Sequence, residues 1–158
     1  MKISFVMVGS LKKSYLREGF AEYVKRLGHY CAVEVVEIKD SLFRKKGSHE
    51  RGLAEEAVRI EKRLAGSGAM RVVLTEKKEG KTFTSRTFSA FIDKSQTEGR
   101  DIAFIIGGPY GLQGDLIRKS EMALSLSAMT LPHELAALTL AEQVYRAFTI
   151  LRGEPYSH

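Results

Sequence analysis

The sequence predicts an α/β protein with a mostly parallel sheet and helices on both faces. Short apolar strand patterns alternate with amphipathic helix patterns along the 158 residues, which is typical of parallel sheets. Residues 102–106, IAFII, are apolar throughout, as expected for a strand buried on both faces. No linker, repeat or low-complexity segment divides the chain, so we expect a single domain over residues 1–158.

The first half of the chain gives the clearest helix pattern. Apolar residues recur at three-and-four spacing from Leu16 to Leu27, and Gly28 follows where a C-cap is expected. Ser48 stands where it can cap a second helix. The elements expected in this half are strands at 3–8, 32–38 and 70–75 and helices at 16–27 and 53–64.

The second half continues the alternation. Thr84 can cap a helix that carries Phe88, Phe91 and Ile92. Alternation of apolar with small residues predicts a short strand from Met122 to Leu126. The elements expected here are a helix from residue 84, strands at 102–106 and 122–126, and a final helix at 133–151.

Composition and charge limit the classes of function. A net charge of +6 and a pI near 9.5 favour a polyanionic partner, although lysines that merely keep the protein soluble explain such an excess equally well. No apolar run approaches the roughly 20 residues that span a bilayer, and no signal peptide is evident, so we expect a cytoplasmic protein and no membrane partner. The single cysteine and four scattered histidines show no metal-ligand spacing, so no metal is expected.

Ligands of parallel sheets bind beyond the carboxyl ends of the strands, so the loops there are the candidate site. Gly80-Lys81-Thr82 resembles the end of a phosphate-binding P-loop, but Thr75 stands where that motif requires glycine, which argues against nucleotide hydrolysis. The glycine-rich segment 107–114 can bring its backbone close to a ligand; a tight turn without any ligand is the alternative. Segment 126–133 has few side chains suited to acid-base chemistry and suits a binding rim.

Three ordered motifs resemble the RlmH family, the SPOUT-class methyltransferases that modify N3 of a pseudouridine in large-subunit ribosomal RNA. The resemblance extends over the full chain, from Val8-Gly9 to Gly153-x-Pro155-Tyr156. The motifs are Ile105-Ile106-Gly107-Gly108-Pro109-x-Gly111-Leu112, Leu124-Ser125-Leu126-Ser127-x-Met129-Thr130-Leu131-Pro132-His133 and Ala141-Glu142-Gln143-x-Tyr145-Arg146-Ala147.

The resemblance implies a homodimer with a deep C-terminal trefoil knot, which is an exception to the rule that chains are not knotted. It also implies S-adenosylmethionine as cofactor and the ribosome with its 23S RNA as partner. Core packing is the alternative role of the apolar residues in the implied site. The implied cofactor residues are Leu74, Gly107, Gly108, Leu126, Ser127, Ala128, Met129, Thr130 and Leu131.

Methyl transfer to an imide nitrogen needs a base or a cation, because N3 must lose its proton. The candidates are His133, Glu142, Tyr145, Arg146, Tyr156 and His158, of which we assign Arg146, Tyr156 and His158 to the catalytic site. An ordinary ion pair between Glu142 and Arg146, four residues apart, is an equally good reading. The family commonly ends in Tyr-His-Lys or Tyr-His-Arg, whereas Ser157 follows Tyr156 here and the histidine comes last.

Three other functions compete with this one. A transfer-RNA methyltransferase of the same class would use the same cofactor on another RNA. A non-catalytic RNA-binding domain would bind RNA without any affinity for the cofactor, and a small-molecule methyltransferase is disfavoured by the positive charge.

Overall fold

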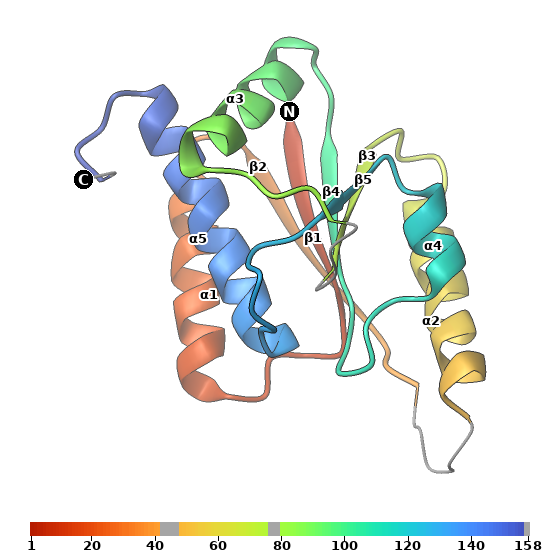
Figure 1. Cartoon of the computed structure of the whole chain (residues 1–158). Coiled ribbons are helices and arrows are strands. Elements are labelled where there is room, and N and C mark those ends of the chain that lie inside the picture. The colour runs from red at the N-terminus through yellow and green to blue at the C-terminus, as the bar shows by residue number, and fades with distance from the viewer. Residues whose placement is uncertain (42–47, 76–79, 157–158) are drawn as a thin grey trace.

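The computed structural model describes residues 1–41, 48–75 and 80–156 and contains a five-stranded sheet with five helices (Figure 1). Strands and helices alternate along these residues, as the sequence predicts. The strands are β1 (Lys2–Val8), β2 (Ala32–Ile38), β3 (Met70–Leu74), β4 (Ile102–Ile106) and β5 (Met122–Leu124). The helices are α1 (Ser14–Leu27), α2 (His49–Leu64), α3 (Ser85–Thr97), α4 (Gly114–Lys119) and α5 (His133–Leu151).

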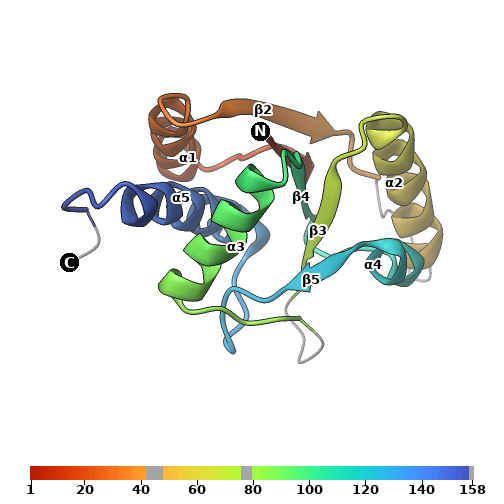
Figure 2. The same ribbon diagram turned by 90° about the horizontal axis from the view of Figure 1, so that it is seen from above.

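All the strand pairs of this sheet are parallel, in the order β2-β1-β4-β3-β5. Helices α1, α3 and α5 cover one face, and α2 and α4 cover the other (Figure 2). The predicted α/β class with helices on both faces is therefore confirmed. Because β4, β3 and β5 are neighbours, their carboxyl ends lie side by side.

Two apolar cores pack against the two faces of the sheet. On the three-helix face, the Phe5 ring packs on Phe20 and Phe104, with ring centroids 5.4 and 6.0 Å apart. The core of the other face is smaller and is built around Ile60 and Ile105, both of which are fully buried. The continuous apolarity of β4 thus has the predicted cause, because the strand contributes side chains to both cores.

Several boundaries differ from the predictions. Thr84 caps α3 as expected, and its hydroxyl and that of Thr87 form a reciprocal capping box. Ser48 precedes α2 but makes no side-chain cap hydrogen bond. The fifth strand ends at Leu124, so Leu126 belongs to the loop. Helix α4 was not predicted, because six residues are too few to show a helical period.

Helix α5 runs from the carboxyl edge of the sheet to the amino edge. At its start, the Glu134 carboxylate accepts hydrogen bonds from the backbone amides of Lys12 and Lys13, 2.8 and 3.0 Å away, in the loop after β1. Beyond its end, Glu154 accepts a hydrogen bond from the hydroxyl of Tyr30, which lies just before β2. In the described part of the chain, no helix is long and apolar enough to cross a membrane.

Candidate functional site

The loops after β3 and β5 are joined by backbone hydrogen bonds at the carboxyl edge of the sheet. The Thr75 amide donates to the Leu124 carbonyl at 2.9 Å. Lys81 pairs with β5 from its other side, because its amide donates to the Ala123 carbonyl at 2.7 Å and its carbonyl accepts from the Ser125 amide at 3.0 Å. The two loops therefore hold each other in place.

Gly80 is needed for this close approach. A β-carbon at this position would lie 2.6 Å from the Thr75 methyl group and 2.9 Å from the Ser125 amide nitrogen. The second of these atoms belongs to the backbone and cannot move aside cheaply. Glycine at position 80 thus serves loop packing, which is a different role from that of glycine in a P-loop.

The loop after β4 is a tight turn closed by the Gly111 amide, which donates to the Gly108 carbonyl at 2.9 Å. Gly111 has a φ of 78°, a conformation that favours glycine. A β-carbon on Gly107 would lie 2.5 Å from the Gly111 carbonyl oxygen. Gly107 and Gly108 are buried, and the turn beyond them is exposed. The turn can therefore form only where position 107 lacks a side chain.

The third loop, residues 125–132, is stabilised by its own serines. Ser125 donates from its hydroxyl to the Ser127 carbonyl, and the Ser127 hydroxyl accepts from the Met129 amide, both at 3.0 Å. Leu126, Ser127 and Leu131 are half-buried, whereas residues 128–130 are exposed. The loop offers apolar side chains and backbone groups to a ligand.

The residues of these three loops fit S-adenosylmethionine. None of the nine predicted cofactor residues carries a charge, and the nearby Lys81 places its ammonium group 4.7 Å from the Phe83 ring centroid. An adenosine moiety needs apolar walls and a few backbone hydrogen bonds, and these residues can provide both. In the described residues, no cluster of histidine, cysteine or carboxylate side chains could hold a metal ion.

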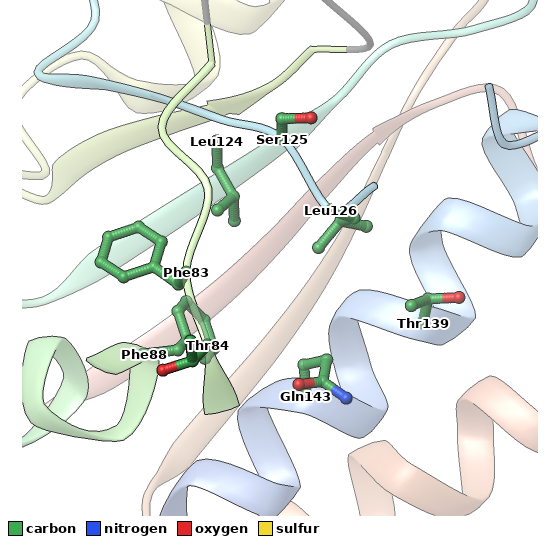
Figure 3. A pocket seen from close by; sticks show the side chains of 8 residues that line it. All are labelled: Phe83, Thr84, Phe88, Leu124, Ser125, Leu126, Thr139 and Gln143. Carbon is green, nitrogen blue, oxygen red and sulfur yellow. The ribbon is translucent and has the colours of Figure 1, made fainter. Parts of the chain in front are cut away.

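A pocket of about 220 Å³ opens between β5, the start of α3 and the middle of α5 (Figure 3). Leu126 is the predicted cofactor residue that lines it. Leu124 and Phe88 give the pocket an apolar floor, and Gln143 faces it from α5. The remaining lining residues are Phe83, Thr84, Ser125 and Thr139.

Arg146 and Tyr156, two predicted catalytic residues, lie together around Glu142. Arg146 donates two hydrogen bonds to one Glu142 carboxylate oxygen, from Nε at 2.9 Å and from Nη2 at 2.6 Å. The Tyr156 hydroxyl lies 3.1 Å from the same oxygen and 3.0 Å from the Tyr23 hydroxyl. The ion-pair reading of Glu142 and Arg146 is thus confirmed. His158, the third predicted catalytic residue, lies outside the described residues.

Aromatic rings enclose this cluster. The Arg146 guanidinium lies 4.8 Å from the Tyr156 ring centroid, and the Tyr145 ring meets Tyr156 edge-on at 4.8 Å. Burial raises the pKa of the Tyr156 phenol, with the Tyr23 hydroxyl and the Glu142 charge acting in the same direction. The hydrogen bond to Glu142 raises the pKa of Arg146. Tyr156 is therefore a neutral donor here, and Arg146 keeps its positive charge.

The predicted site residues thus form two groups at opposite edges of the sheet. The cofactor residues gather at the carboxyl edge, whereas Tyr156 lies near Tyr23, Tyr30 and the amino edge. Between Glu134 and Arg146, α5 advances about 18 Å at 1.5 Å per residue. Gln143 lies between the two groups, because it lines the pocket together with Leu126 and donates a hydrogen bond to the Glu142 carboxylate at 2.6 Å. Arg146 and Tyr156 themselves do not line this pocket.

Most of the pocket lining, and the contact between Tyr23 and Tyr156, were not predicted from the sequence. Phe83 follows the Gly80 turn and Gln143 follows the candidate Glu142, so proximity to these motifs was the available signal. Tyr23 ends the segment Gly19-Phe20-x-Glu22-Tyr23, which also resembles the family. Its contact with Tyr156, however, depends on the packing of α1 against α5.

Comparisons with known proteins agree with these observations. A family model described as "Predicted SPOUT methyltransferase" matches residues 1–158. A ribosomal RNA large subunit methyltransferase H from Streptococcus equi subsp. equi is 42% identical over 160 residues, covering 99% of this chain and 99% of that protein. The chain belongs to the SPOUT methyltransferases and, within them, to the methyltransferase H family. The resemblance drawn from the sequence motifs is thereby confirmed.

Two solved structures share the fold of this chain. A probable methyltransferase from Bordetella pertussis superposes with a TM-score of 0.59 at 17% identity, covering 92% of this chain and 95% of the other. A "putative methyltransferase" from Legionella pneumophila, solved with bound SAM, gives a TM-score of 0.50 at 18% identity, covering 94% of this chain and 66% of the other. At these identities, the likeness concerns the fold alone.

Proposed function

We propose that this protein transfers the methyl group of S-adenosylmethionine to N3 of a pseudouridine in the 23S RNA of the assembled ribosome. The observation that carries the proposal is the 42% identity to a ribosomal RNA large subunit methyltransferase H across the whole chain. The nine predicted cofactor residues at the carboxyl edge of the sheet support it, because none of them is charged and together they suit an adenosine moiety.

The three loops would hold the cofactor within one domain over residues 1–158. Backbone groups of Gly107 and Gly108 and of segment 126–131 would bind the adenine edge, while Leu74, Leu126 and Leu131 enclose the ring. When bound, the cofactor supplies an electrophilic methyl group on a sulfonium, so the chain has chiefly to align the attacking nitrogen with it.

Arg146 would stabilise the imide anion of the substrate. Each unit by which the N3 pKa exceeds the ambient pH adds about 1.4 kcal/mol to the cost of removing the proton. A guanidinium that stays charged offsets this cost by its electrostatic attraction for the anion. Tyr156 and His158 would cover the base after it leaves its RNA stack.

A homodimer would bring the two groups of residues together. In the proposed dimer, the tail of one copy would reach the loops of the other, and a two-fold axis provides that geometry twice. The C-terminal deep trefoil knot is part of the same proposal, and it rests on family membership. The net charge of +6 favours binding to ribosomal RNA, and ribosomes place the reaction in the cytoplasm.

The deciding experiment incubates the protein with tritiated S-adenosylmethionine and ribosomes that lack the modification, then maps the label by digestion and mass spectrometry. We expect label on one pseudouridine of the large-subunit RNA. Label on transfer RNA instead would favour the transfer-RNA methyltransferase. Calorimetry with S-adenosylhomocysteine distinguishes a non-catalytic RNA-binding domain, which would show no heat of cofactor binding.

A second experiment tests whether each site is shared between the two copies of a dimer. Two inactive variants, Gly107→Ala and Arg146→Ala, are mixed after reversible dissociation of their dimers. In a shared site, half of the dimers are mixed and each mixed dimer has one intact site, so about a quarter of the wild-type activity should return. If each site belonged to a single protomer, no activity would return. Unmixed variants carried through the same treatment are the controls.

A further inference from the structure

A pair of aromatic rings, of which Tyr110 is exposed and His49 is half-buried, lies beside the Gly107–Gly108 turn. The Tyr110 ring, on the turn itself, has its centroid 4.2 Å from that of His49, the first residue of α2, with 60° between the ring planes. Tyr110 is 51% exposed. The two residues are 61 positions apart in the chain, so the pair depends on the fold.

The turn fixes the place of Tyr110 relative to the proposed cofactor site. Residues 108–111 form a four-residue turn with Pro109 at its second position and Tyr110 at its third, and the 2.9 Å bond between Gly111 and Gly108 closes it. Because consecutive Cα atoms are 3.8 Å apart, the Tyr110 backbone is within about 7 Å of Gly108. The ring therefore stands at the margin of the site.

Folding alone gives little reason for a tyrosine at this position. Turns favour glycine, asparagine, aspartate and serine for their backbone preferences, and Tyr110 buries only about half of its surface. His49 contacts the ring and restrains its orientation. An aromatic ring that is held in place and open to solvent is the usual platform for an unstacked RNA base.

We infer that Tyr110, supported by His49, stacks on a nucleobase of the ribosomal RNA that flanks the methylated nucleotide. The inference rests on the proposed function and extends it to a substrate-positioning residue. A base that enters the site carries its neighbours past the turn, where one of them meets the Tyr110 ring. The positive net charge brings the RNA backbone to the protein, and the ring pair adds a contact to a base.

The test compares Tyr110→Ala, Tyr110→Phe and His49→Ala, with Tyr15→Ala as a matched control at a tyrosine that is 68% exposed on α1. Loss of stacking should raise KM for unmodified ribosomes about tenfold in Tyr110→Ala, which corresponds to about 1.4 kcal/mol. Tyr110→Phe should keep KM within twofold, because the ring is retained, and His49→Ala should raise it about threefold. An unchanged KM in Tyr110→Ala would overturn the inference.

Two further measurements distinguish a failure of this inference from a failure of the proposed function. Affinity for S-adenosylhomocysteine should be the same in all four variants, and a loss in Tyr110→Ala would assign the ring to the cofactor site instead. Binding to ribosomes, followed by sedimentation, does not need catalysis. If the wild type binds ribosomes but transfers no methyl group, the proposed function fails. Tenfold weaker binding of Tyr110→Ala would even then support the stacking contact. Equal binding of wild type and Tyr110→Ala would overturn it.

Cross-linking determines whether Tyr110 contacts RNA or protein. p-Benzoylphenylalanine placed at position 110 should, on irradiation with bound ribosomes, attach to large-subunit RNA. Attachment to a ribosomal protein would overturn the inference.

Discussion

Arg146 and Glu142 form a two-bond ion pair on one face of α5, with Nε and Nη2 of the arginine 2.9 and 2.6 Å from the same carboxylate oxygen. The side chains are 26% and 17% exposed. The Tyr156 hydroxyl donates to the same oxygen, so Glu142 joins the middle of α5 to the segment that follows the helix. Glu142 thereby orients the residue to which we assign catalysis.

We expect Glu142→Gln to lower the free energy of unfolding by about 1–3 kcal/mol, because the variant loses charge-assisted hydrogen bonds in a partly buried place. Urea denaturation measures the change. Glu22→Gln is the matched control, since Glu22 forms the same kind of i,i+4 pair with Arg26 at the surface, where solvent screens the pair and its loss should have little effect on stability. Equal losses in both variants would contradict a special role for the Glu142 cluster.

Gly107→Ala should weaken S-adenosylhomocysteine binding at least tenfold. The added methyl group would lie 2.5 Å from the Gly111 carbonyl oxygen, so the turn after β4 would have to open. Gly114→Ala is the control, because its methyl group would meet a flexible arginine side-chain end at 3.3 Å. Calorimetry should find normal affinity in the control, and normal affinity in Gly107→Ala as well would show that the turn does not shape the cofactor site.

Titration of the Glu56 carboxyl group should lower the free energy of unfolding as the pH rises. It is a buried carboxyl group on α2 that accepts a hydrogen bond from the Ser41 amide at 2.7 Å. Burial raises its pKa, aided by the charge of Asp40, and the Ser41 hydrogen bond opposes the rise. The folded state therefore binds the Glu56 proton more tightly than the unfolded state does. The contribution of Glu56 to the free energy of unfolding is full below the ordinary pKa of 4.5 and is lost as the pH rises through the pKa of the folded state.

Denaturation curves from pH 4 to 7 test this by difference. Relative to Glu56→Gln, wild type should lose stability as the pH rises. Glu34→Gln is the control of opposite sign, because the hydrogen bond from Lys2 lowers the pKa of Glu34 and its contribution is lost as the pH falls. Parallel curves for wild type and Glu56→Gln would refute the assignment.

Cys31 should react slowly with thiol reagents in the folded protein. Burial raises the pKa of its thiol to about 11, from an ordinary 9.0. At pH 8, this leaves about a hundredfold less thiolate, the reactive form. Modification by iodoacetamide should therefore be about a hundred times slower in the native protein than in urea, and equal rates would show that the thiol is not shielded.

The rate of ribosome methylation should fall steeply with added salt. If about four basic side chains contact phosphates, affinity for ribosomes falls about a hundredfold between 50 and 200 mM salt, since each contact releases counterions. KM measured across this range gives the slope. A flat response, or equally efficient methylation of a short oligonucleotide, would argue against a large phosphate-binding surface.

The sequence predicted what depends on local pattern. Thr84 was expected to cap a helix and does, and the four-residue spacing of Glu142 and Arg146 indicated their ion pair. The contact between Tyr23 and Tyr156 could not be predicted, because it exists only after α1 and α5 pack together. The same holds for His49 and Tyr110. Helix α4 was missed because a single turn and a half carries no periodic signal.

The strand order has a consequence for biosynthesis. Strand β5 pairs with β3 and is made after β1 to β4, and α5 follows it. While a chain is being translated, these last elements emerge after the rest of the sheet. One wall of the proposed cofactor site is the loop between β5 and α5, so a nascent chain that lacks these elements has no complete site. A chain still under synthesis is therefore expected not to bind the cofactor.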